Sequence, residues 1–207
     1  MSILKLYRHA LSGHSHRAQL FISILGLDAE VIDVDLMNGA HKTADFLQKN
    51  IFGQVPVLED GDVNIADSNA ILVYLANQYD PTHTWLPIEP VKAAEVQRFL
   101  SVSAGQVAFG PATARLVNVF GAKLDHTTAK ERANSLLGTL DSHLQNRQWL
   151  VGEQPTIADL ANYAYIAHAP EGDVSLEPYP NVRAWLQNIE NLPGFIPMQA
   201  TAVGLAA

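Results

Sequence analysis

The sequence predicts an α/β domain followed by an all-α domain, and two observations support this class. Up to about residue 80, short β-prone runs alternate with stretches of helical spacing in the order β-α-β-α-β-β-α, and strand-like alternation is scarce afterwards. Three prolines in residues 81–90 mark the boundary, because each proline disfavours helix at the residue before it. We therefore expect domains at 1–80 and 91–207, joined by a linker at 81–90.

The first four elements of the α/β domain read as two strands that alternate with two helices. The apolar run Ile3–Tyr7 predicts the first strand, and apolar residues at helical spacing predict a helix over 15–25 that Gly26 ends. A second strand is predicted at 30–35 and a short helix at 42–49. Because a helix joins the two strands, we expect them to run parallel.

The last three elements of this domain read as a hairpin and a closing helix. Strands predicted at 56–58 and 63–65 flank the dipeptide Asp60-Gly61, which is typical of tight hairpins. We therefore expect these two strands to pair antiparallel. The helical spacing that follows predicts a helix over 68–79.

Four segments of helical spacing fill the second domain: 91–120, 127–146, 157–168 and 182–191. Gly110-Pro111 interrupts the first of these segments, so we expect a kink there. Thr156 and Asp159 precede an apolar run with the spacing of a helix capping box. This position favours a structural role for Asp159 over a catalytic one.

The composition excludes several classes of function. A chain of 207 residues that is 48% hydrophobic has ample material for a core. A net charge of −8 argues against nucleic acid or an anionic membrane as the main partner and favours a small molecule. No apolar run reaches the roughly 18 residues of a spanning helix, and charge interrupts the N-terminal apolar residues before a signal peptide can form. We expect a cytoplasmic protein.

The chain contains no cysteine, which excludes disulfides, thiolate metal sites and a cysteine nucleophile. The pair His14 and His16 lacks a third ligand at a recognisable spacing, so we expect no metal site. The glycine-rich motifs of dinucleotide and P-loop proteins and the serine elbow of hydrolases are absent too. These absences argue against nucleotide-dependent and hydrolase functions.

Residues 10–17 lead directly from the first predicted strand into the first predicted helix. A hydroxyl group here lies beside unpaired backbone N–H groups and the positive end of the helix dipole, which suits it to stabilising an anion. Ser12 and Ser15 are therefore candidates for chemistry. The alternative is that either serine only caps the helix.

Two further segments can present polar groups to a ligand. If the Val55-Pro56 bond is cis, the main chain of Val55 can face outward and pair with an extended peptide; the alternative is an ordinary edge-strand proline. Asp67 and Ser68 open the next helix. One interpretation is that both residues only cap the helix. The other is that together they hold an amino group and a carboxylate of a ligand at the helix N-terminus.

Together these segments resemble the cytosolic glutathione S-transferases over nearly the whole chain. The resemblance rests on Gln54-Val55-Pro56 and Asp67-Ser68 in the first half, and on Thr156-Ile157-Ala158-Asp159 in the second. Two departures are Ile51, where the family often has proline, and Asp67, where many members have glutamate. Further segments match in the family's order and approximate spacing: Leu6-Tyr7, Leu11-Ser12-Gly13, His41-Lys42, Phe52–Gly61, Asp67–Ile71, Tyr179–Val182 with Trp185, and Leu192–Phe195.

The resemblance implies a thioredoxin-like βαβαββα domain that binds glutathione, followed by a helical-bundle domain that contributes a pocket for the second substrate. It implies a homodimeric transferase that conjugates glutathione, its co-substrate, to small hydrophobic electrophiles without a metal. Because cysteine is absent, the chain resembles serine-type members of the bacterial theta- or nu-like kind rather than cysteine-type members. Two alternatives stay open: glutathione-dependent peroxidase activity, and a binding module without catalysis.

Carried onto this sequence, the resemblance implies a role for each site residue. Ser12 donates a hydrogen bond to the glutathione thiolate, with Tyr7 as the alternative donor. Val55 pairs with the cysteinyl backbone, Ser68 receives the γ-glutamyl carboxylate and Asp67 approaches the α-amino group. The glycyl end is assigned to His41, Lys42 and Gln54.

The electrophile pocket is expected to include Leu11 and apolar side chains from residues 106–120. Phe109 is the aromatic candidate and Arg115 is a lone cation in this stretch. The alternative for the aromatic side chains of this stretch is ordinary core packing.

Overall fold

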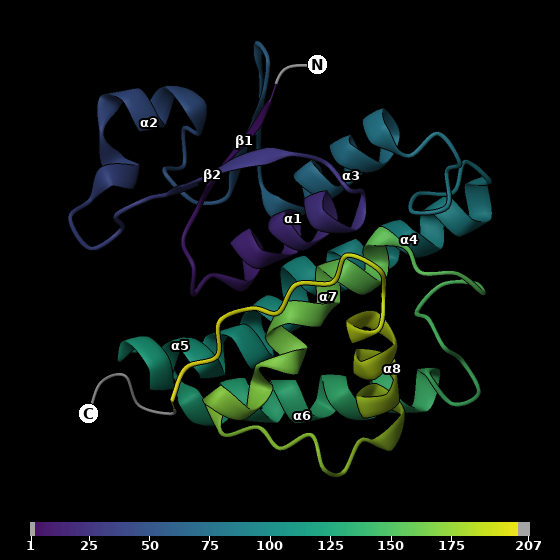
Figure 1. Ribbon diagram of the computed structural model, residues 1–207. Coiled ribbons are helices and arrows are strands. Elements are labelled where there is room, and N and C mark those ends of the chain that lie inside the picture. The colour runs from purple at the N-terminus through teal and green to yellow at the C-terminus, as the bar shows by residue number, and fades with distance from the viewer. Residues whose placement is uncertain (1–2, 203–207) are drawn as a thin grey trace. The chain divides into compact units, whose positions relative to one another are not determined.

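The computed structural model describes residues 3–202 of the chain (Figure 1). The chain divides into two compact units. The first unit runs up to His83 and also contains Leu192–Gln199. The second unit contains Thr84–Asn191 and, among the described residues, also Ala200–Ala202.

The first unit is built on a four-stranded sheet with the strand order β2-β1-β3-β4. β1 and β2 run parallel, whereas β1 with β3 and β3 with β4 run antiparallel. The predicted parallel pair and hairpin are thus confirmed. The strand bounds are Leu4–Arg8 for β1, Ala29–Asp33 for β2, Val57–Asp60 for β3 and Val63–Ala66 for β4.

Helices cover both faces of this sheet (Figure 1). The buried side chains of Leu4 and Leu6 alternate with the exposed Lys5 and the half-buried Tyr7, so β1 has two different faces. On one face lie α1 and α3, which pack against each other. On the other, Phe46 of α2 meets the Tyr7 ring edge-on at 6.3 Å between centroids. The helix bounds are Gly13–Ile24 for α1, Ala44–Lys49 for α2, preceded by a short 3-10 helix Ala40–Lys42, and Ser68–Tyr79 for α3.

Residues 192–199 return to the first unit, whereas the sequence assigned everything from residue 91 onward to the helical domain. Two hydrogen bonds hold this segment: His16 Nε2 donates to the Ile196 carbonyl at 2.8 Å, and Ser23 Oγ donates to the Gly194 carbonyl at 2.7 Å. Gly194 has a φ of +80°, and a Cβ there would lie 2.7 Å from the Ser23 carbonyl oxygen. The segment is neither helix nor strand, so hydrophobic periodicity carries no signal for its placement.

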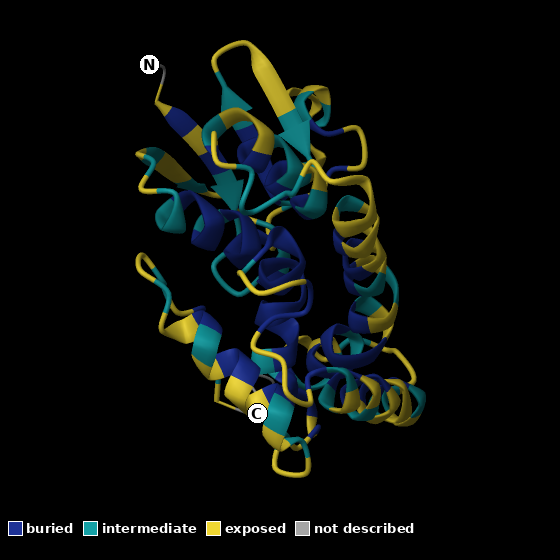
Figure 2. Ribbon diagram, turned by 90° about the vertical axis from the view of Figure 1, so that its right-hand side faces the viewer, coloured by how far each residue is buried: buried dark blue, intermediate teal, exposed yellow. Residues whose placement is uncertain are grey.

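The second unit is helical and is organised around α7. Every residue from Ile157 to Ile166 of α7 is buried, which makes α7 the core helix (Figure 2). The described part of this unit contains no strand, as its sequence pattern predicts. Its elements are α4 (Pro90–Val102), a π-helical segment η2 (Ser103–Ala112), α5 (Thr113–Phe120), α6 (His126–His143), α7 (Ile157–Ala167), a 3-10 turn η3 (Ala169–Gly172) and α8 (Pro180–Glu190).

The kink expected at Gly110-Pro111 takes the form of the ten-residue segment η2. Pro111 has no N–H to donate and its ring opposes ordinary helical hydrogen bonding, so the turn around it widens. Gly110 faces α6 closely, since a Cβ there would lie 3.0 Å from the Ala133 nitrogen. The wide turn and the missing side chain together let η2 and α6 pack closely.

Asp159 lies in the first turn of α7 and is fully buried. The predicted capping box with Thr156 is present, and the Asp159 carboxylate accepts hydrogen bonds from Thr156 N and Leu150 N, each at 2.9 Å. It also accepts from Trp185 Nε1 at 2.9 Å. Burial raises the pKa of Asp159, while the hydrogen bonds from Leu150, Thr156 and Trp185 act in the opposite direction. The carboxylate therefore ties α7, α8 and the loop before α7 together, which is the structural role predicted.

We expect Asp159→Ala to lower the free energy of unfolding by at least about 3 kcal/mol, because it leaves several buried donors without an acceptor. The matched control is Asp125→Ala, which removes an exposed carboxylate that caps α6 through Thr128 N. That change should cost about 1 kcal/mol. Urea unfolding of both variants measures the difference, and equal losses would contradict the central role of Asp159.

Candidate active site

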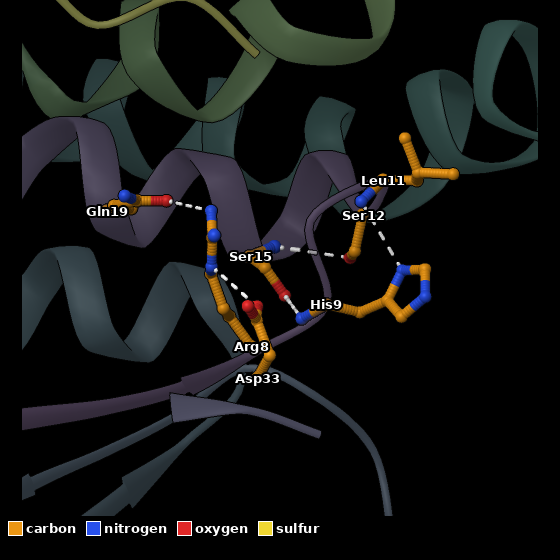
Figure 3. A network of polar contacts seen from close by, with 7 residues as sticks. All are labelled: Arg8, His9, Leu11, Ser12, Ser15, Gln19 and Asp33. Carbon is orange, nitrogen blue, oxygen red and sulfur yellow. Dashed lines mark hydrogen bonds and ion pairs between the residues drawn. The ribbon is translucent and has the colours of Figure 1, made fainter. Parts of the chain in front are cut away.

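Ser12 lies in the loop between β1 and α1 and is half-buried. It is the N-cap of α1: its Oγ accepts a hydrogen bond from Ser15 N at 3.2 Å (Figure 3). Its main-chain N–H donates to the His9 carbonyl at 3.0 Å, which fixes the loop. The capping bond uses a lone pair of Oγ and leaves the hydroxyl proton available to another acceptor. Capping and donation to a ligand are therefore compatible roles for Ser12.

Ser15 differs from Ser12 because it is completely buried. Its Oγ accepts from His9 N at 3.2 Å and so supports the same loop from inside (Figure 3). The His9 ring accepts from Leu11 N at 3.3 Å through Nδ1. Of the two candidate serines, Ser12 is the more accessible one.

The hydroxyl group of Tyr7 is engaged within the sheet. It donates to Glu59 Oε2 at 3.0 Å, and Glu59 also pairs with the Lys49 ammonium group. Burial, followed by the hydrogen bond to Glu59, raises the pKa of Tyr7. Tyr7 thus has a carboxylate acceptor in place, whereas among the described residues 3–202 no carboxylate accepts from Ser12 Oγ.

The segment before β3 has a fixed main chain. The Val55-Pro56 bond is cis, and the half-buried Val55 side chain packs against a cluster that contains Phe46 and Val57. Pairing between β1 and β3 begins at Val57, so the main chain of Val55 lies beyond the end of this ladder. The buried side chain of Asn50 braces the segment: it donates to Gln54 O at 2.9 Å and accepts from Phe52 N at 3.0 Å.

The structure brings the residues predicted for the glycyl end to this same segment. Lys42 Nζ donates to the carbonyl oxygens of Phe52 and Gly53 at 3.1 and 2.9 Å. Gly53 has a φ of +55°, and a Cβ there would lie 2.6 Å from the His41 carbonyl oxygen. Gln54 follows and is exposed. An ammonium group has three protons to donate, so the two carbonyl bonds leave Lys42 able to bind a further acceptor.

Asp67 and Ser68 open α3, as the sequence predicts. Asp67 has a φ of +75°, which residues other than glycine seldom adopt, and such strain is concentrated at functional sites. Its carboxylate accepts from Asn69 N at 2.8 Å and from Ala70 N at 3.0 Å. Ser68 is buried, and its Oγ lies 2.8 Å from Arg17 Nη1 and 3.2 Å from His14 Nδ1.

Arg17 and His14 belong to this cluster, although sequence reasoning gave them no role. Burial, followed by the charge of Arg17, lowers the pKa of His14 to about 3, so its imidazole is neutral near pH 7. Arg17 is almost fully buried and precedes Phe21, another buried residue of α1, by four positions. A charged residue on the apolar face of a predicted helix was the signal that could have found it.

Two features that bear on metal and membrane binding can be read from the described residues. His14 contacts Ser68 and His16 bonds to Ile196, so the two histidines have different partners. Among residues 3–202, no three histidine or carboxylate side chains gather in the way a metal ion requires. Within the same range no helix has the length and apolar character to cross a bilayer.

The residues predicted for the electrophile pocket fall in different places. Leu11 is a half-buried residue of the first unit. Phe109 is 59% exposed and lines a cavity of about 630 Å³ within the second unit. Arg115 does not line this cavity. The other lining residues come from η2 and α6: Gly105, Gln106, Glu131, Arg132, Ser135, Leu136 and Thr139.

Arg115 is buried and forms an ion pair with Glu171 at 2.5 Å. Glu171 also accepts from His168 Nδ1 at 2.7 Å and from Thr201 N at 3.0 Å. Although burial acts to raise the pKa of Glu171, the hydrogen bonds from His168, Thr201 and Arg115 hold it at about 2. Arg115 therefore serves to hold η3 against α5, where its charge is compensated.

We expect Glu171→Gln to lower the free energy of unfolding by about 3 kcal/mol at pH 7, because it removes the carboxylate that pairs with the buried charge of Arg115. The deficit relative to wild type should shrink as the pH falls from about 5 toward 2. In that range the carboxylate protonates in the unfolded chain first and then in the folded protein, whose pKa is about 2. The exposed carboxylate Glu177 supplies the control, Glu177→Gln, and a deficit that is constant with pH would contradict the prediction.

Comparisons with known proteins identify the family of the chain. Residues 2–77 match the model of the glutathione S-transferase N-terminal domain, and residues 105–193 match that of the C-terminal domain. The chain therefore belongs to the glutathione S-transferase family, and its enzyme class is that of a glutathione transferase.

Individual relatives are similar over almost their whole length. Glutathione S-transferase 3 of Zea mays is 34% identical over 208 residues, with 94% of this chain and 92% of that protein covered. The crystal structure of a glutathione S-transferase from Pseudomonas fluorescens has a TM-score of 0.90 and 32% identity, covering 96% of this chain and all of that one. A glutathione transferase homologue from Drosophila mojavensis, solved with bound glutathione, has a TM-score of 0.84 and 28% identity, covering 93% and 90%.

Proposed function

We propose that the chain conjugates glutathione to small hydrophobic electrophiles and that the Ser12 hydroxyl activates the thiol. The observation that carries this proposal is the hydrogen bonding of the Ser12 hydroxyl group. Its Oγ accepts from Ser15 N at the positive end of α1, and its proton remains for donation. The competing hydroxyl of Tyr7 already donates to Glu59. This contrast favours a serine-type enzyme, as the theta- or nu-like resemblance implies.

The proposed reaction needs a thiolate, because the thiolate is the nucleophile. A hydrogen bond from Ser12 favours the charged form of the glutathione sulfur and so lowers its pKa. A decrease of one to two units corresponds to about 1.4 to 2.7 kcal/mol, which a charge-assisted hydrogen bond at a helix N-terminus can supply. The thiol proton leaves to solvent. The sulfur then forms a bond to the electrophilic carbon, and the leaving group departs with its electron pair.

We propose that glutathione binds in an extended form along the first unit. Its cysteinyl main chain pairs with Val55, which lies beyond the end of the β1–β3 ladder. Its γ-glutamyl carboxylate meets Ser68 and its α-amino group meets the exposed carboxylate of Asp67. The glycyl carboxylate approaches Lys42, with His41 and Gln54 beside it.

For the electrophile we propose a contact with Phe109, because this apolar side chain is largely exposed and lines the cavity of the second unit. Leu11, a half-buried residue of the first unit, stays a prediction. Arg115 was the third candidate, and its ion pair with Glu171 favours a structural role instead. A cytoplasmic location remains our expectation for the protein.

We expect the thiol of glutathione bound to the wild-type protein to ionise about one to two pH units below the free thiol, whose pKa is about 8.5. Ser12→Ala should return the bound thiol to nearly its free value while glutathione still binds. The matched control is Tyr7→Phe, which removes the competing hydroxyl and should keep the shift. Ultraviolet absorbance of the thiolate, titrated with each protein in excess, measures the ionisation.

Each other outcome of this titration has a clear meaning. A shift that Tyr7→Phe abolishes and Ser12→Ala preserves would move the donor role to Tyr7. Glutathione that binds to the wild type with an unshifted pKa would support a binding module without catalysis. Conjugation and peroxidase activity are then compared directly, with an aryl halide and an organic hydroperoxide as substrates.

We propose that the chain forms a homodimer, since it exposes several large apolar side chains. In the first unit Ile51 and Phe52 are 79% and 71% exposed. We expect gel filtration at micromolar concentration to give twice the 22.5 kDa of one chain, and Phe52→Asp to shift the protein toward the monomer. The control is Met37→Asp, at an exposed apolar residue outside this segment. A wild-type monomer would contradict the proposal.

A further inference from the structure

A buried arginine of α1, Arg17, places its guanidinium group at the N-terminus of α3. Arg17 is 1% exposed. Its Nη1 donates to Ser68 Oγ at 2.8 Å and to Asn69 Oδ1 at 2.6 Å. Both acceptors belong to the first turn of α3, so a single guanidinium group fixes two consecutive side chains there.

The direction of each hydrogen bond follows from the chemistry of the groups. A guanidinium group can only donate, so Ser68 Oγ accepts from Arg17 and must direct its own proton elsewhere. His14 Nδ1 lies 3.2 Å from that oxygen. Burial lowers the pKa of His14 to about 3, so the imidazole is neutral and can accept at Nδ1 when its proton sits on Nε2. Arg17 therefore donates to Ser68 Oγ, and the Ser68 hydroxyl group donates to His14 Nδ1.

We infer that Arg17 is a positioning residue for the γ-glutamyl carboxylate of glutathione. Arg17 donates to one lone pair of Ser68 Oγ and so directs the hydroxyl proton away from itself. The Ser68 hydroxyl group then donates to His14 in the free protein and to the ligand carboxylate in the complex. This inference rests on the proposed function, because it names how one subsite of that function is built.

The surrounding charges favour an anion at Ser68. Arg17 donates to a hydroxyl and to an amide, which are both neutral, so neither of these two bonds neutralises the guanidinium charge beside the positive end of α3. The His14 imidazole is neutral near pH 7 and adds no charge of its own. The carboxylate of Asp67 is turned to the backbone N–H groups of Asn69 and Ala70. The carboxylate end of a γ-glutamyl group therefore has a favourable partner at Ser68, and its ammonium end has one at Asp67.

The test compares three peptides that differ only at the γ-glutamyl end. Glutathione carries both charged groups, 4-aminobutyryl-Cys-Gly lacks the α-carboxylate, and glutaryl-Cys-Gly lacks the α-amino group. Calorimetry gives the Kd of each peptide for the wild type, Arg17→Lys and Ser68→Ala. Arg8→Gln is the control, because Arg8 is a second arginine of the same unit that bonds to Asp33 and Gln19 instead.

We expect Arg17→Lys to weaken glutathione and glutaryl-Cys-Gly about tenfold, the loss of one oriented hydrogen bond to a charged ligand. Its effect on 4-aminobutyryl-Cys-Gly should stay within about twofold, because that peptide has no carboxylate for Ser68 to bind. KM for glutathione should rise while kcat changes little, since a positioning residue for binding does not touch the sulfur. In a Ser68→Ala background, Arg17→Lys should have almost no further effect.

Four results would overturn the inference. Equal losses for all three peptides would show that Arg17 supports the fold rather than the carboxylate subsite, and so would independent losses from Arg17→Lys and Ser68→Ala. An unchanged Kd in Arg17→Lys would remove its role. If Arg17→Lys does not fold, Asn69→Ala, which removes one acceptor of Arg17, must show the same selective loss, and its failure to do so would also overturn the inference. Wild-type protein that binds none of the peptides would instead overturn the proposed function itself.

Discussion

The packing of α1 against α3 beneath the sheet is the constraint on which the proposed site depends. It sets the N-termini of α1 and α3 side by side in one unit. Ser12 directly precedes α1, and Ser68 is the first residue of α3. Arg17 crosses from one helix to the other and bonds to Ser68. A change in how these helices pack would therefore separate the group proposed to bind the sulfur from the group proposed to bind the γ-glutamyl end.

Buried carboxylates play the corresponding part in the second unit. Asp159 joins α7 to Trp185 of α8 and to the loop before α7, and Glu171 joins α5 to η3. Each is paired with donors that would be costly to leave buried alone. The helical unit is thus held by two polar centres as well as by apolar packing, and neither of them is proposed to do chemistry.

Local patterns in the sequence predicted most elements, and the exceptions have physical causes. The bounds of α3 match the predicted helix over 68–79, because its caps and spacing agree. The π-helical turn around Pro111 was expected only as a kink, since periodicity assumes ordinary helical geometry. Ser12, Val55, Asp67 and Ser68 could be singled out as candidates because they lie next to element boundaries. Arg17 and His14 were missed because their importance arises from a contact with residues more than 50 positions away.

The return of residues 192–199 to the first unit changes the topology of the protein. The chain leaves the first unit after His83, re-enters it at Leu192 and passes back to the second unit at Ala200, so three covalent connections join the two units and the helical unit is not simply appended. A protein cut after residue 83 would lose the carbonyl groups that accept from His16 and Ser23. Residues 192–199 follow α8 in the chain, so the thioredoxin-like unit receives this segment only after the helices α4 to α8 have been synthesised.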